Sequence, residues 1–337
     1  MLDTMHRMKR LAFLLLILSL GCQPLKKKNP YLTSGDGYVN VEGGKVWYGI
    51  MGEGDATPYL LLHGGPGATS RGGINLIDIT DERPVILMDQ LGGGLSTYHE
   101  DTTLLTVEHF VQQVRAIKEA LNLNEFYLTG SSWGTALALE YYSEYPDGVK
   151  GIVFNSPYFS TSTWIADTDT LIATLPDSTA QAIKIAEQTN SFDTESYSKA
   201  MDVFFENFIL RTPTSELNTP SYKIFNPSYD TMELKGNSFI YNYMWGPSEF
   251  SPTGTLLNYE NIDALRQIKV PVLFTTGEYD EARPKSVRKY ASMVANSQFI
   301  EIPNAGHATM WDNKEMVIKS LRDFANRVDQ EPTYLKN

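Results

Sequence analysis

The sequence contains very little cysteine, little histidine and a deficit of basic charge. Its 337 residues include 1 cysteine and 5 histidines, and 28 lysines and arginines stand against 40 acidic residues. The single cysteine, Cys22, excludes an internal disulfide and any cysteine-rich metal site. A formal net charge of −12 argues against nucleic-acid binding, because a phosphate backbone requires a basic face.

Long hydrophobic runs are absent too, apart from one near the N-terminus. Leu11 to Leu20 is almost wholly apolar and follows a basic segment at residues 7–10. The run is too short to span a bilayer, and its basic flank is typical of a secretory signal. Because small residues lead into Cys22, we predict a lipoprotein-type signal peptide over residues 1–21 with lipidation at Cys22. A plain secretory signal with an incidental cysteine is the alternative.

This prediction fixes an expected location for the mature protein. Residues 22–37 read as a tether, and Lys26 to Lys28 would lie beside the lipid anchor, near a membrane surface. We therefore expect an exported protein that is lipid-anchored to the bacterial cell envelope, on its periplasmic or its surface face.

Short apolar runs alternate with helical patterns along most of the remaining chain, which predicts an α/β fold with a mostly parallel sheet flanked by helices. This alternation stops near Phe159 and resumes near Val270, and the segment between them is rich in aromatic residues and helical patterns. We predict a core over residues 38–158 and 260–330, with a helical cap inserted over residues 159–259. Expected strands are 38–50, 59–62, 84–88, 126–129, 149–154, 270–275 and 299–302, and expected helices are 105–121, 135–144, 178–188, 197–210, 285–294 and 314–327.

A Gly-x-Ser-x-Gly pattern joins one of these strands to the helix after it. It reads Gly130-Ser131-Ser132-Trp133-Gly134, and this strand–turn–helix context is the one a nucleophile elbow needs. The glycines permit a tight, strained turn with Ser132 at its tip. Ser132 is therefore the candidate nucleophile of an α/β-hydrolase fold. An ordinary glycine-rich turn is the alternative.

A serine nucleophile needs a positioned base, and few histidines are available. His307 follows the last predicted strand, where the chain order Ser…Asp…His of the α/β-hydrolases requires the base. His6 lies in the predicted signal, and His109 lies in a helical pattern. His63 heads a glycine-rich loop, where a bracing hydrogen bond suffices, and His99 stands in a polar loop segment.

The orienting acid should follow the preceding strand. Val270–Thr275 leads into Gly277-Glu278-Tyr279-Asp280-Glu281, and we assign the role to Asp280, with Glu278 and Glu281 as alternatives.

An oxyanion hole needs two backbone N–H donors near the nucleophile. The residue after the nucleophile, Trp133, supplies one, and Gly65 in the loop His63–Gly67 is our choice for the other. The run Gly92–Gly94 lacks the form of a phosphate-binding loop and is interpreted as a tight turn.

Together these motifs resemble the prolyl aminopeptidases, also called proline iminopeptidases, and within that family the tricorn-interacting aminopeptidase in particular. The resemblance runs from about Tyr38 to Arg327. Its carriers are His63-Gly64-Gly65-Pro66-Gly67, Asp89-Gln90-x-Gly92-x-Gly94-x-Ser96, Gly130-x-Ser132-Trp133-Gly134, Gly277-Glu278-Tyr279-Asp280-Glu281, Gly306-His307 and, at the end of the cap, Gly246-Pro247-Ser248-Glu249-Phe250 with Thr253-Gly254-Thr255.

The resemblance implies an α/β-hydrolase with a helical cap that releases the N-terminal residue of short peptides, with no metal and no other cofactor. It implies that Glu249 and Glu281 hold the free α-ammonium group of the substrate, and paired carboxylates are suited to binding a cation in a closed site. The chain departs from the family at Trp133, where tyrosine is common in the tricorn-interacting aminopeptidase, and it matches only in patches inside the cap. Proline or another small or apolar residue is therefore the expected first residue.

Two alternatives remain open at this stage. One is a different hydrolase on the same fold, acting on esters, lactones or amides, because function depends on the site and not on the fold. The other is a catalytically inactive binding lipoprotein, against which the complete set of Ser132, Asp280 and His307 argues.

Overall fold

The computed structural model describes residues 28–97, 101–217, 225 and 236–330. The predicted signal peptide over residues 1–21, the lipidation site Cys22 and His99 lie outside the described residues. Within the described ranges, no helix is both long enough and apolar enough to cross a membrane.

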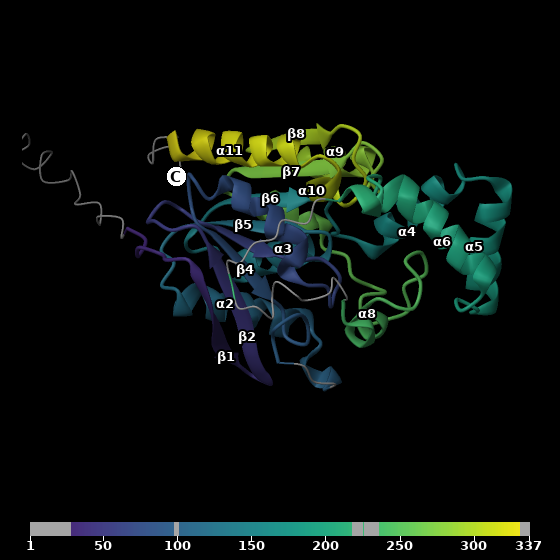
Figure 1. The fold of residues 1–337 in the computed structure, drawn as a ribbon, viewed down its shortest axis with the longest axis horizontal. Helices are drawn as coiled ribbons and strands as arrows, with labels where there is room; N and C mark the ends of the chain where they lie inside the picture. The colour runs from purple at the N-terminus through teal and green to yellow at the C-terminus, as the bar shows by residue number, and fades with distance from the viewer. Residues whose placement is uncertain (1–27, 98–100, 218–224, 226–235, 331–337) are drawn as a thin grey trace, which may run out of the picture.

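An 8-stranded sheet forms the centre of the molecule, in the order β1-β2-β4-β3-β5-β6-β7-β8 (Figure 1). β1 and β2, and β2 and β4, pair antiparallel, and all later neighbours pair parallel. The prediction of an α/β-hydrolase fold with a mostly parallel sheet is thus confirmed. The strands are β1 (Gly35–Val41), β2 (Gly44–Met51), β3 (Tyr59–Leu62), β4 (Val85–Asp89), β5 (Phe126–Ser131), β6 (Val149–Asn155), β7 (Val272–Gly277) and β8 (Ser297–Ile302).

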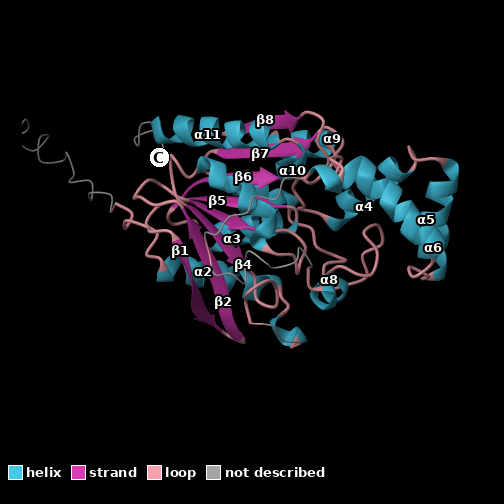
Figure 2. Cartoon of the chain, in the orientation of Figure 1, coloured by secondary structure: helices cyan, strands magenta, loops and turns pink. Residues whose placement is uncertain are grey.

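The central strands are buried on both faces, so they read as apolar runs and not as an alternating pattern. Their side chains alternate between two cores: Leu60 and Leu128 belong to one, and Leu61 and Tyr127 to the other. The first core packs against α2 (Val107–Ala120), α3 (Trp133–Glu144) and α9 (Pro284–Ala291). The second packs against the 3₁₀-helix η1 (Ser70–Ile79) and α11 (Lys314–Gln330). Figure 2 shows the sheet held between these helices.

Most predicted helices are present within a few residues of their expected ends. Thr106 caps α2 as expected, since its side chain accepts a hydrogen bond from the His109 N–H. The pattern expected as one helix over 197–210 is instead α6 (Glu195–Phe204) followed by a π-helical turn, η3 (Phe205–Ile209). The helical elements not anticipated are η1, η2 (Thr102–Leu104), α4 (Thr161–Ile172), η4 (Thr214–Glu216), α8 (Ser238–Met244), η5 (Ile262–Gln267) and α10 (Thr309–Asp312).

Helices inserted between β6 and β7 stand beyond the arrowheads of β7 and β8 (Figure 1). The insertion includes α4, α5 (Asp177–Thr189), α6 and α8, and it has its own small core around Phe204, Phe208 and Phe250. It therefore lies over the carboxyl ends of the parallel strands, the edge at which open α/β sheets carry their sites.

The sheet begins earlier in the chain than the pattern indicates. β1 starts at Gly35, and Leu32 already pairs with Gly54 and is buried. Asn29 accepts hydrogen bonds from the backbone N–H groups of Asn124 and Glu125. Residues 22–37 were expected to form a tether, but the last part of this segment is joined to the core by hydrogen bonds to the backbone. Such pairing produces no apolar periodicity in the sequence, so the sequence pattern does not predict it.

Candidate active site

Ser132 occupies a strained turn between β5 and α3. Its φ of 53° and ψ of −126° are rare for a residue with a side chain. The flanking glycines are explained by close backbone approach. A Cβ on Gly130 would lie 2.3 Å from the Gly134 carbonyl oxygen, and one on Gly134 would lie 2.1 Å from the Leu62 carbonyl oxygen. The pattern therefore forms the elbow that the sequence predicts, with Ser132 at its tip.

Asp280 and His307 face each other at the ends of β7 and β8. Asp280 Oδ1 lies 2.7 Å from His307 Nδ1, and Asp280 is fully buried. Oδ1 also accepts a hydrogen bond from the Ala282 N–H. Oδ2 accepts three hydrogen bonds, from the Ser156 hydroxyl at 2.6 Å, the Thr276 hydroxyl at 3.0 Å and the Gly277 N–H at 3.1 Å. These donors stabilise the ionised carboxylate without charge from a neighbouring cation.

The alternative acids lie elsewhere. Glu278 is exposed, and its Oε2 accepts a hydrogen bond from the Asn304 N–H. Glu281 Oε1 is 3.7 Å from His307 Nδ1, beyond hydrogen-bond distance. The geometry therefore pairs His307 with Asp280.

The loop that carries His307 is fastened to the inserted helices. The N–H groups of His307 and Ala308 donate to the carbonyl oxygens of Phe208 and Ile209, at 2.8 and 2.7 Å. Both carbonyls belong to the π-helical turn η3, and Trp164 of α4 packs edge-on against the imidazole with ring centroids 5.6 Å apart. The insertion thus helps to fix the orientation of the candidate base.

Burial alone would lower the pKa of His307, but the charge and hydrogen bond of Asp280, with a smaller contribution from Glu249, raise it above its ordinary value. An imidazolium formed at His307 during a reaction is therefore stabilised by these carboxylates. Ser132 and His307 line the same cavity, which brings the candidate nucleophile and base to one space.

The two candidate oxyanion donors lie beside Ser132. Trp133 is the first residue of α3, so its N–H has no partner within the helix. Gly65 has a φ of 111°, which favours glycine, and it lines a pocket together with Ser132 and Trp133. A Cβ on Gly64 would lie 3.0 Å from Ser132 Cβ, so this loop can pass the nucleophile only because it carries glycines.

Gln90 links the two sides of this region, a role that the sequence analysis did not assign. Its Nε2 donates to the His63 carbonyl oxygen at 3.0 Å, and its Oε1 accepts from Trp133 Nε1 at 3.0 Å. His63 Nε2 in turn accepts from the Gln90 N–H, which confirms the predicted bracing role of His63. The buried amide of Gln90 therefore holds the loop of Gly65 in register with the start of α3.

A Gln90→Leu variant will test this linkage. Leucine has a similar size but leaves the His63 carbonyl and the Trp133 indole N–H unpaired in the interior. We expect the free energy of unfolding to fall by about 1–3 kcal/mol. We also expect kcat to fall about tenfold, because the oxyanion donors lose their alignment.

Thermal unfolding and hydrolysis kinetics measure the two effects. The matched control is Gln112→Leu, which removes an exposed glutamine of α2. Equal kcat values for Gln90→Leu and the wild type would mean that Gln90 does not position the donors.

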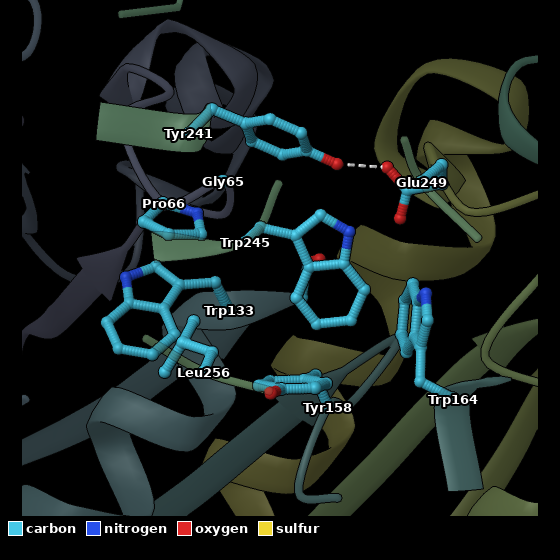
Figure 3. A pocket seen from close by; sticks show the side chains of 10 residues that line it. Gly65, Pro66, Trp133, Tyr158, Trp164, Tyr241, Trp245, Glu249 and Leu256 are labelled. Atoms are coloured by element: carbon cyan, nitrogen blue, oxygen red, sulfur yellow. Dashed lines mark hydrogen bonds between the residues drawn. The ribbon is translucent and has the colours of Figure 1, made fainter. Parts of the chain in front are cut away.

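A small aromatic pocket adjoins Ser132 on the side of the insertion (Figure 3). Tyr158 lies at its base, with the rings of Trp164 and Trp245 packed edge-on to it at 5.7 and 5.5 Å between centroids. The carboxylate of Glu249 points into the upper part of the pocket and accepts a hydrogen bond from the Tyr241 hydroxyl. The pocket thus combines flat apolar walls with one acidic group, and its aromatic members other than Trp133 were not identified from the sequence.

Glu281 lies behind the imidazole and is not among the residues that line this pocket. It is buried, and its Oε2 has no hydrogen-bond partner among the residues that the structure describes. Burial raises its pKa well above the usual value, and the nearby carboxylates of Glu249 and Asp280 raise it further. Burial likewise raises the pKa of Glu249. No lysine or arginine in the described part of the chain forms an ion pair with Glu249 or Glu281.

No group of three or more histidine, cysteine or acidic side chains in the described part of the chain is arranged to hold a metal ion.

Comparison with known proteins identifies the family of the chain. Residues 57–314 match the family model described as alpha/beta hydrolase fold. A proline iminopeptidase of Heyndrickxia coagulans is 35% identical over 294 residues, which cover 87% of this chain and 99% of that protein. The crystal structure of a proline iminopeptidase of Mycobacterium smegmatis aligns with a TM-score of 0.77 and 26% identity, covering 87% of this chain and 98% of that one. The crystal structure of VinJ has the same TM-score and identity and covers 89% and 100%. The chain belongs to the proline iminopeptidase family of α/β-hydrolases.

Proposed function

We propose that this protein is a serine aminopeptidase that releases an N-terminal residue, proline or another small or apolar residue, from short peptides. The observation that carries the proposal is the acidic group in the aromatic pocket, Glu249, with Glu281 nearby and Ser132 at the pocket's edge. An ester or lactone without an amine has no use for two buried carboxylates. The proline iminopeptidase relatives support the same activity.

The reaction follows from the positions of three side chains. Ser132 Oγ attacks the first peptide carbonyl carbon, and its proton passes to His307 Nε2, while Asp280 holds the Nδ1 proton. The N–H groups of Trp133 and Gly65 stabilise the oxyanion. As the C–N bond breaks, His307 donates the proton to the leaving amine. The N-terminal residue is then bound to Ser132 as an ester. Water then attacks this ester, with His307 again as base, and frees the amino acid and Ser132.

The substrate's α-ammonium supplies the positive charge that the two glutamates lack. Each carboxylate is stabilised as an anion once a cation lies between them, so binding of the ammonium draws protons off the pair. An acetylated N-terminus carries no charge and would leave the carboxylates uncompensated. The flat rings of Tyr158, Trp164 and Trp245 suit a compact apolar side chain such as the proline ring. We also propose, from the sequence motifs alone, that within its family the protein resembles the tricorn-interacting aminopeptidase.

The test is hydrolysis of Pro-, Ala- and Leu-p-nitroanilide beside their N-acetylated forms, with Ser132→Ala as the blank. We expect cleavage of the free-amine substrates alone, lost in the blank, and the best substrate identifies the preferred first residue. Cleavage of the acetylated forms, or of none, would reject the aminopeptidase and favour a hydrolase of esters or other amides.

We further propose that the protein is exported and anchored to the cell envelope by a lipid on Cys22, with residues 1–21 removed. The support is the sequence alone: a basic flank, an apolar run and the only cysteine of the chain. In a bacterial host, the full chain should incorporate radiolabelled palmitate and fractionate with membranes, and Cys22→Ser should do neither. If the wild-type protein incorporates no palmitate and appears in the soluble fraction, the proposed lipid anchor at Cys22 is wrong.

A further inference from the structure

A second and larger cavity opens from the other side of Ser132. Its volume is about 450 Å³, within the range of small-molecule sites. It extends between η1, α11 and the face of the sheet that they cover, and apolar side chains dominate its wall, among them Leu61, Leu76, Val153, Trp311, Val317 and Leu321. Of the described residues that line it, none is Asp, Glu, Lys or Arg.

The position of His307 distinguishes the roles of the two cavities. Ser132 and Gly65 line both cavities, but the aromatic pocket is lined by Glu249 and not by His307, whereas the larger cavity is lined by His307 and not by Glu249. In an acyl transfer, the group that receives the proton from the base is the leaving group. The leaving amine must therefore lie on the side of His307, away from the carboxylate of Glu249.

We propose that the larger cavity is the leaving-group subsite and takes the apolar side chain of the substrate's second residue. The inference rests on the aminopeptidase function proposed above. An uncharged, largely apolar wall favours leucine or phenylalanine at this position and disfavours aspartate or lysine, whose charges would lose their hydration. Thr129 lines the cavity, and its buried hydroxyl has no hydrogen-bond partner among the described residues. This hydroxyl can therefore form a hydrogen bond with a bound substrate.

The cavity reaches the surface at Gly72 of η1, which is exposed and belongs to the lining. A Cβ on Gly72 would meet no atom within 4 Å, whereas one on the neighbouring Gly73 would lie 2.0 Å from Leu61 Cδ2. A larger side chain can therefore be introduced at Gly72 without a backbone clash. Because Gly72 belongs to the lining, we expect a leucine there to narrow the cavity.

The experiment measures kcat/KM for dipeptide amides that share the best first residue and carry Gly, Leu, Phe or Asp second. The proteins are the wild type, Gly72→Leu and the matched control Gly72→Ala. For the wild type we expect Leu and Phe to exceed Gly by about tenfold or more, as burial of a large apolar side chain implies, with Asp lowest. Gly72→Leu should lose most of the preference for Leu and Phe while the Gly substrate changes less than about twofold. Gly72→Ala adds only a methyl group and should lose less of this preference than Gly72→Leu.

The outcomes separate this inference from the proposed function. A wild type that cleaves all four dipeptide amides equally well, or a Gly72→Leu variant that loses activity equally on all of them, overturns the subsite alone. A wild type that cleaves none overturns the aminopeptidase and the subsite with it. If Gly72→Leu does not fold by thermal unfolding, Met310→Phe narrows the same cavity from α10 and is held to the same expectations.

Discussion

An Asp280→Asn variant will remain folded and lose about 10⁴-fold in kcat on the best p-nitroanilide. Three donors converge on Oδ2, from Ser156, Thr276 and Gly277. They require an acceptor there, so the asparagine carbonyl takes that position and its NH₂ group turns toward His307. Nδ1 must then accept a hydrogen bond, which places the imidazole proton on Nε2. In that tautomer the ring cannot take the proton of Ser132.

The matched control is Asp263→Asn, an exposed aspartate of η5 whose side chain is 98% accessible. It should keep the activity of the wild type. Because the NH₂ group would also face the Ala282 N–H, some loss of stability is expected, and thermal unfolding must show that Asp280→Asn is folded at the assay temperature. Retention of kcat within about tenfold would exclude Asp280 as the orienting acid and return the role to Glu281 or Glu278.

The sequence predicted the parts of this site that lie at strand ends. Ser132, Asp280 and His307 each follow an apolar run, and parallel strands bring such positions to one edge of the sheet. The sheet topology therefore brings together residues that lie far apart in the chain. Trp133 and Gly65 could be chosen for the same reason, since they adjoin the elbow and the first of these loops.

Other participants leave no local signal. Ser156 and Gln90 act through hydrogen bonds to Asp280 and Trp133, which lie 124 and 43 positions away, and a lone serine or glutamine after a strand is common. The helices α4 and α8 contain few strong helix formers, and their apolar residues pack on the sheet domain and on each other, which blurs the helical period. For that reason the aromatic pocket, built from these helices and their flanks, could be located only in three dimensions.

A Glu281→Gln variant will be more stable than the wild type and a poorer aminopeptidase. Glutamine keeps the size of the side chain and removes the cost of burying an ionisable carboxyl group beside Asp280 and Glu249. We expect the free energy of unfolding to rise by about 1–2 kcal/mol at neutral pH. We expect kcat/KM for free-amine substrates to fall about 100-fold or more, because one carboxylate of the ammonium site is lost. Activity on p-nitrophenyl acetate, an ester without an amine, should change little.

The pH dependence identifies the cause of the added stability. The pKa of Glu281 is higher in the folded protein than in the unfolded chain, so its contribution to folding is most favourable below the unfolded pKa of about 4.3 and is lost as pH rises through the folded value. The increase in the free energy of unfolding caused by Glu281→Gln should therefore be small near the unfolded pKa of about 4.3. It should grow with pH until the pH reaches the pKa of Glu281 in the folded protein. Glu278→Gln, at an exposed glutamate of the same loop, is the matched control. A gain that is constant across this range would point to improved packing or hydrogen bonding, and a variant with full activity on free-amine peptides would remove Glu281 from the ammonium site.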